Sequence, residues 1–149
     1  MNQLLLFCFI LLAGISCQKG SSLQSIHTDG LEISMNTACG WCAPGDSMHI
    51  NKTATSYTYY ASSCNRVGSP NIQTTNQNDW KELIAALDIT AFNNIDLNAC
   101  GVCYDGCEEW VTIRQGNNSH TIRYDNINNV VLDPIRPFLK KLRAIKDGF

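Results

Sequence analysis

Short stretches of alternating apolar and polar residues run through the first half of the chain. Residues 31–35 alternate strictly, which is the period of a strand with one buried face. Residues 47–50 and the Thr- and Tyr-rich segment 53–62 also have the composition of strands. Further on, residues 110–114 and 120–124 flank a turn rich in Gly and Asn, which predicts a β-hairpin.

A helical period follows the polar segment 65–78, which we expect to be a loop. Asp79 and Glu82 have the spacing of a capping box, so we expect a helix that opens at Asp79 and ends near Asp88. Its apolar side chains recur at i, i+3, i+4 and i+7, as on a buried helix face. They are Trp80, Leu83, Ile84 and Leu87.

A second amphipathic helix is predicted near the end of the chain. Asp133 is expected at its N-cap and Pro134 at its first position. Its apolar face consists of Ile135, Phe138, Leu139, Leu142 and Ile145. The order of strands, helix, hairpin and helix predicts an α+β fold, in which an antiparallel sheet of about four to six strands carries two helices packed on one face.

The apolar run before Cys17 changes this picture by placing the protein outside the cytosol. Its length and its small final residues are typical of a secretory signal rather than of a membrane-spanning helix. A Cys at the cleavage point resembles the lipobox of bacterial lipoproteins. We therefore expect a signal peptide over 1–16, a lipidated Cys17 with a polar tether over 17–25, and a single domain over 26–149. Ordinary secretion, with Cys17 as one more thiol, is the alternative.

The formal net charge of -2 bears on the class of partner. A nucleic-acid-binding domain needs a basic footprint, and this near-balanced chain does not have one. We therefore expect no nucleic-acid partner. The expected partners are a membrane, reached through the N-terminal lipid, and a protein of the cell envelope.

Six of the eight cysteines lie beyond Cys17, and an even number in an oxidising compartment predicts structural disulfides. These six are Cys39, Cys42, Cys64, Cys100, Cys103 and Cys107. Fifteen pairings are open to six cysteines. The pairing expected here joins Cys39 to Cys42, Cys100 to Cys103, and Cys64 to Cys107.

Two Cys-x-x-Cys motifs leave other chemistries open. In a redox protein, one thiolate of such a pair attacks a disulfide and the other resolves it. Two such pairs can also form a Cys₄ zinc site, although zinc-binding pairs usually lie closer together than Cys42 and Cys100. Thiol–disulfide exchange or zinc handling is therefore the alternative function to a structural role.

No set of residues predicts catalysis, a metal site or a cofactor. Asp105, Glu108 and Glu109 gather carboxylates around a Gly turn but do not have the spacing of a calcium loop. The three histidines lie far apart in the sequence. We expect a protein that is not an enzyme, with no cofactor and no metal. The contact residues that we expect for a partner are large amphipathic aromatics, namely Trp41, Tyr57, Tyr59 and Tyr60.

A longer motif begins at Cys100-Gly-Val-Cys103 and continues through Asp105-Gly106 to an aromatic-led strand at Trp110. Together with Trp80-x-x-Leu83 and the Cys39–Cys42 turn, it resembles a group of small uncharacterised lipoproteins of Bacteroidetes-type bacteria. The resemblance spans roughly residues 33–145. It implies export and this fold, but it transfers no catalytic residue.

The sequence thus predicts a disulfide-braced, lipid-anchored protein of the cell envelope that faces the periplasm or the exterior. Its expected role is that of a binding or structural module.

Overall fold

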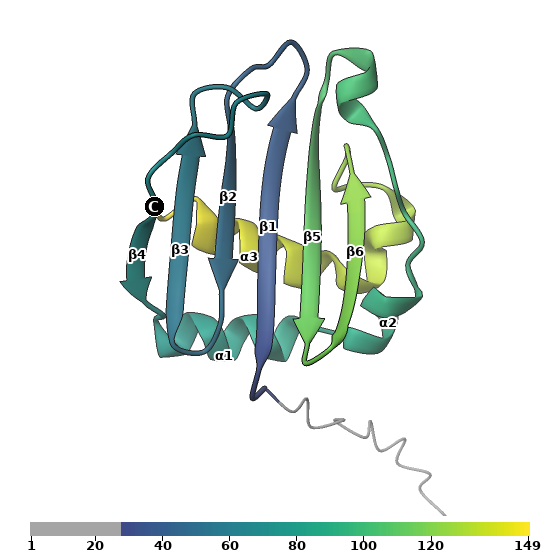
Figure 1. Ribbon diagram of the computed structural model, residues 1–149. Coiled ribbons are helices and arrows are strands. Elements are labelled where there is room, and N and C mark those ends of the chain that lie inside the picture. The colour runs from purple at the N-terminus through teal and green to yellow at the C-terminus, as the bar shows by residue number, and fades with distance from the viewer. Residues whose placement is uncertain (1–27) are drawn as a thin grey trace, which may run out of the picture.

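The computed structural model of the protein describes residues 28–149, and its centre is a six-stranded sheet (Figure 1). The order of the strands is β4-β3-β2-β1-β5-β6, and every neighbouring pair is antiparallel. The predicted signal peptide, Cys17 and the tether lie outside the described residues. The strands are β1 (Leu31–Cys39), β2 (Gly45–Ile50), β3 (Ala54–Tyr60), β4 (Asn71–Thr74), β5 (Cys107–Gln115) and β6 (Asn118–Tyr124).

The first strand of the chain lies at the middle of the sheet. Ile33 on β1 is paired with Ile50 on β2 and with Ile113 on β5, so the apolar positions of three strands form a continuous row. The predicted hairpin is β5 and β6, joined by two residues, of which Gly116 has a φ of 57°. Glycine adopts this left-handed conformation readily, which explains its position in the turn.

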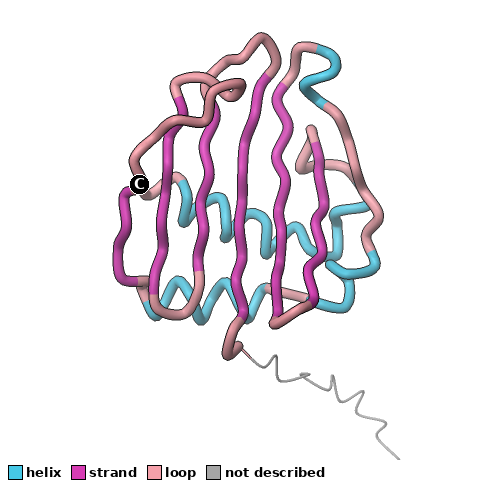
Figure 2. The backbone as a smooth tube through the Cα atoms, in the orientation of Figure 1, coloured by secondary structure: helices cyan, strands magenta, loops and turns pink. Residues whose placement is uncertain are grey.

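The three α-helices of the described residues cover the same face of the sheet (Figures 1 and 2). The predicted α+β class is therefore confirmed, with α1 and α3 as the two main helices. The helices are α1 (Gln77–Ala86), α2 (Ile89–Asn94) and α3 (Arg136–Lys146), with two 3₁₀ helices, η1 (Gly101–Tyr104) and η2 (Val130–Ile135).

The core lies between this face and the helices. Its sheet side consists of alternate residues of β1, β2, β5 and β6, and its helix side of the apolar stripes predicted from the sequence. The largest fully buried side chains include Tyr124, Phe92, Phe138, Met35, Met48, Leu83, Leu132 and Ile135. Lys141 of α3 joins the two main helices, because its Nζ lies 2.9 Å from Asp79 and 2.7 Å from Glu82.

A buried ion network attaches the end of α3 to the sheet. Lys146 is only 8 % exposed, and its Nζ donates to Thr37 Oγ1 at 2.8 Å and to Asp46 Oδ1 at 3.1 Å. Glu109 completes the network, with one oxygen 3.8 Å from Lys146 and the other paired with Arg143. Each charge in this network therefore has a partner of opposite sign, which offsets the cost of removing it from water.

The predicted starts of both helices were wrong. The α1 helix begins two residues before Asp79, because the Asn76 side chain accepts the backbone N–H groups of Asn78 and Asp79 and so provides the N-cap. At the second helix, Asp133 lies inside η2 and pairs with Arg136, where α3 begins. The polar segment 65–78 also contains an unpredicted strand, β4.

The face of the sheet opposite the α-helices is polar, and no α-helix of the described residues covers it. We call it the open face. Hydroxyl groups pair across its strands, as in the contact of 2.8 Å between Thr112 and Thr121 and that of 2.9 Å between Ser47 and Tyr60. A hydrogen-bonded polar face can remain in water without a covering layer. Any surface for a ligand on this side is therefore formed by strands and by the loops at their ends.

Candidate functional site

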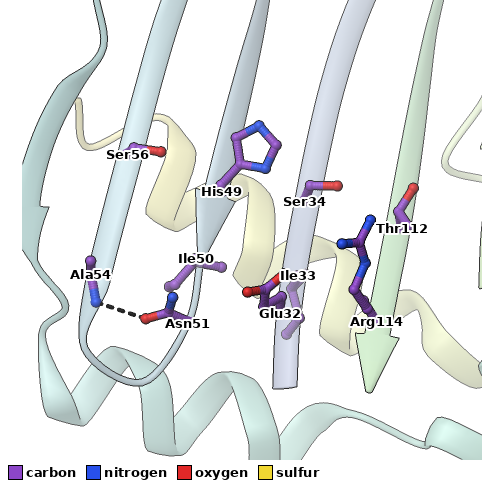
Figure 3. Close-up of a pocket in the computed structure, with 10 residues that line it drawn as sticks. All are labelled: Glu32, Ile33, Ser34, His49, Ile50, Asn51, Ala54, Ser56, Thr112 and Arg114. Atoms are coloured by element: carbon purple, nitrogen blue, oxygen red, sulfur yellow. Dashed lines mark hydrogen bonds between the residues drawn. The ribbon is translucent and has the colours of Figure 1, made fainter. Parts of the chain in front are cut away.

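Two grooves lie on the open face. The first has a volume of about 390 Å³ and is lined mostly by polar side chains of β1, β2, β3 and β5. Figure 3 shows Ser34, His49 and Arg114 on the face turned away from α1 and α3. Glu32 and Arg114 are register partners across β1 and β5. This groove is lined by no large aromatic side chain, which makes it the weaker candidate for a ligand.

The second groove, of about 430 Å³, lies where β1 ends and β5 begins. Its floor contains Glu108, Trp110 and Arg123, and its rim contains Trp41 and Arg66. We call it the Trp41 groove. Ala38, the register partner of Glu108, is small and leaves room for the hollow beside the carboxylate.

Two disulfides surround this groove, and they correct the expected pairing. Cys39 is bonded to Cys107 and Cys42 to Cys64, so the predicted Cys39–Cys42 and Cys64–Cys107 bonds were wrong. The reason is register: Cys39 lies directly opposite Cys107 in the β1–β5 pair, with 3.9 Å between their Cα atoms.

The third predicted bond is confirmed. Cys100 and Cys103 are joined across the turn that forms η1. All six cysteines of the described residues are thus in disulfides, so none of them is a thiolate available to a metal ion.

The turn that carries Trp41 is held at both ends. The backbone N–H of Gly40 donates to the carbonyl of Gly106 at 2.9 Å, which extends the β1–β5 ladder beyond Cys39. On the other side, the N–H of Ser63 donates to the carbonyl of Ala43 at 2.9 Å, next to the Cys42–Cys64 bond. The turn therefore sits between two disulfides and two backbone hydrogen bonds.

Trp41 itself has an unusual conformation and exposure. Its φ is 55° and that of Cys42 is 54°, both in the left-handed region that non-glycine residues rarely adopt. The Trp41 side chain is 86 % exposed, although an indole is among the largest apolar surfaces in proteins. A strained backbone that presents an exposed indole on a braced turn is typical of a functional position.

The floor of the groove is organised around a second indole. Trp110 is half-buried on β5, with the guanidinium carbon of Arg66 4.7 Å from its ring centroid and that of Arg123 5.3 Å away. Arg123 is the register partner of Trp110 on β6, whereas Arg66 reaches it from the loop between β3 and β4. The two cations attract the electron-rich ring and hold it in place.

Glu108 is the buried charge of the groove. Its side chain is 4 % exposed, and its Oε1 lies 3.5 Å from Arg123 Nη1. Its Oε2 is buried and has no hydrogen-bond partner among the described residues. Buried carboxylate oxygens are nearly always hydrogen-bonded, so this acceptor is one of the few unsatisfied buried polar atoms within residues 28–149.

The predicted contact aromatics do not gather in one place. Tyr60 lies on the open face and bonds to Ser47, but it does not line the Trp41 groove. Tyr57 packs against the core on the helix side, where its ring stacks on Phe149 at 5.7 Å. Tyr59 shares the side of Tyr57 and is 55 % exposed.

Four groove residues were not predicted from the sequence. The alternation of β5 places Glu108 and Trp110 on one face, which is a signal that the sequence contains. Arg123 follows from the hairpin register. Arg66 lies in an irregular loop, and no local pattern indicates that it reaches Trp110.

The carboxylates around the Gly turn are separated by the fold. Glu108 faces the groove, whereas Glu109 belongs to the ion network beneath α3. Within residues 28–149, no cluster of three or more His, Cys, Asp or Glu side chains has the arrangement of a metal site.

No protein-family model matches this chain, and no curated protein is significantly similar to it in sequence. None of the helices in the described part of the chain has the length and apolar character needed to cross a bilayer.

Proposed function

We propose that the protein is an exported binding module, anchored to a membrane of the cell envelope through a lipid on Cys17, and that the Trp41 groove is its binding site. The observation that carries this proposal is the presentation of Trp41. The left-handed backbone of Trp41 and Cys42 costs stability, and two disulfides hold this turn in place while its indole stays exposed. Stability alone provides no reason for such a turn, whereas binding does.

The proposal of export draws on two independent features. The residues before Cys17 have the composition of a secretory signal, and the described domain contains three disulfides, which form and persist in oxidising compartments. Mass spectrometry of the protein from its natural host tests it. The expected species begins at an acylated Cys17, and the variant Cys17→Ser is released from membranes. An unmodified Met1 in the native protein would contradict the proposal.

Site-specific cross-linking tests the binding role. A photoreactive p-benzoylphenylalanine replaces Trp41 in the full chain, and the matched control carries it in place of Tyr104, which is 87 % exposed on η1 and does not line the groove. We expect a discrete adduct in native envelopes from position 41 and none from position 104. Equal labelling from both positions, or none from either, would overturn the proposal.

Thiol–disulfide exchange is the second candidate function. It is favoured by the Cys100–Cys103 bond, which closes a Cys-x-x-Cys motif in a surface turn with Cys103 exposed. A partner dithiol would attack one sulfur of this bond, pass through a mixed disulfide and leave two thiols on the chain. Thiol titration after incubation with reduced thioredoxin tests this candidate. Selective reduction of the Cys100–Cys103 bond would support this candidate function. If the bond is not reduced, the candidate is ruled out.

A further inference from the structure

The unsatisfied oxygen of Glu108 indicates what the Trp41 groove is able to bind. The carboxylate lies in the floor of the groove, is 4 % exposed, and has one oxygen without a partner. A ligand N–H or O–H group that reaches this carboxylate from the groove would supply a hydrogen bond that the described residues do not provide. The ligand therefore carries at least one N–H or O–H group.

The charges of the groove restrict this donor further. Arg66 and Arg123 both lie over Trp110, and no carboxylate among the described residues pairs with Arg66. An ammonium ion that approached Glu108 would meet two guanidinium groups, and a carboxylate or phosphate would meet the buried charge of Glu108. Neither a cationic nor an anionic ligand is complementary to the whole site.

A hydroxyl group matches this arrangement, because it both donates and accepts. Adjacent hydroxyls on a ring can donate to the Glu108 carboxylate and accept from Arg123, which are already neighbours at 3.5 Å. Such contacts need no net charge on the ligand. The polar groups of the groove therefore favour a neutral polyol.

The aromatic residues add a shape requirement. The C–H face of a pyranose ring is flat and apolar, so it can cover the exposed indole of Trp41 while its hydroxyls bond to the floor. The volume of about 430 Å³ lies in the range of small-ligand sites. An aromatic wall with a few convergent polar groups is the common composition of such sites.

We propose that the Trp41 groove binds a neutral glycan, with Trp41 against the face of a sugar ring, and with Glu108 and Arg123 bonded to its hydroxyls. This inference rests on the proposed binding function and names its ligand class. Arg66 lies at the rim, where its guanidinium is free to donate to a ring or hydroxyl oxygen.

A glycan array with neutral, sulfated and uronic-acid oligosaccharides tests the proposal on the full mature chain. We expect retention of one or more neutral oligosaccharides. Titration of the retained sugar should shift the emission of the two groove indoles, Trp41 and Trp110, whereas Trp80 is buried in the core and should not respond.

Two variants and one control assign the binding to the groove. Trp41→Ala and Glu108→Gln should each weaken binding by about tenfold or more, and Tyr104→Ala should leave it unchanged. Trp41 is a surface residue, so its variant is expected to fold even where Glu108→Gln does not, and circular dichroism confirms the fold of each.

Three results would overturn the proposal. They are retention of no glycan, retention of charged glycans alone, and retention of a neutral glycan that Trp41→Ala does not weaken. Cross-linking from position 41 distinguishes a failure of the glycan proposal from a failure of the proposed binding function. A Trp41-specific adduct with a protein would preserve the binding module and refute the glycan, whereas absence of both signals refutes the two proposals together.

Discussion

Cys39, the last residue of β1, lies directly opposite Cys107, the first residue of β5, and the bond between them joins the ends of these two central strands beside the Trp41 turn. Because Gly40 continues the same ladder through its bond to Gly106, the turn starts from a backbone that is fixed on both strands. The Cys42–Cys64 bond then holds the far side of the turn against the loop after β3. The disulfides thus brace the site as well as the domain.

Removal of each disulfide should lower stability in the order of the loops that the bonds close. The separations are 68 residues for Cys39–Cys107, 22 for Cys42–Cys64 and 3 for Cys100–Cys103. In the chain-entropy account, the paired Cys→Ser variants lose about 4, 3 and 2 kcal/mol of unfolding free energy respectively. Urea denaturation of the three double variants measures this order. A larger loss for the Cys100–Cys103 pair than for the other two would contradict it.

Gly40→Ala should destabilise the turn that carries Trp41. A Cβ at this position would lie 2.8 Å from the Cα of Asp105, which is backbone and cannot easily move. We expect a loss of about 2 kcal/mol, as for other overpacked positions. The control is Gly30→Ala, where φ is 74° and nothing lies within 4 Å, so only backbone strain of about 1 kcal/mol is expected. Thermal unfolding of both variants distinguishes the two effects, and a smaller loss at Gly40 than at Gly30 would refute the close approach.

Lys146→Met should destabilise the protein through the charges that it leaves behind. The substitution keeps the aliphatic stem but removes the cation between Asp46 and Glu109, both of which are largely buried. We expect a loss of about 3 kcal/mol, at the lower end of values for broken buried pairs. Lys140→Met, on the exposed side of the same helix, should change stability by less than about 0.5 kcal/mol. Equal losses in the two variants would show that the network contributes nothing specific.

Tyr124 should make the fold sensitive to alkaline pH. Burial raises its pKa above the ordinary value of 10.0, and the neighbouring Glu109 carboxylate raises it further. Above pH 10 the unfolded chain releases this proton and the folded chain keeps it, so the stability that is present below pH 10 is lost as the pH rises. The slope is about 1.4 kcal/mol per pH unit.

Chemical denaturation between pH 8 and 11 measures this dependence. The Tyr124→Phe variant should show a shallower fall, because it has no phenol to ionise at this position. Tyr57, whose pKa is raised by burial and by Asp46, contributes in the same direction and remains in both proteins. Identical slopes for the two proteins would rule out Tyr124 as the source.

The local pattern of the chain predicted most of the sheet and both main helices, and the misses have physical causes. Strand β4 is exposed along its whole length, so it has no apolar alternation and is held by pairing with β3 alone. The start of α1 was misplaced because Asn76 and Asp79 both have cap-forming side chains, and the choice between them depends on the chain that precedes the helix. Trp41 was predicted as a contact residue from its chemistry, whereas its partners in the groove were not.

The order of apolar and polar residues determined by itself that this chain forms an antiparallel sheet with one apolar face and helices to cover it. That information is local, because the side-chain periods of strands and helices repeat every few residues. The cysteine pairing and the meeting of Arg66, Glu108 and Trp110 depend on which strands are neighbours and in which register. These relations join residues far apart in the chain, so only the packing of the whole domain decides them.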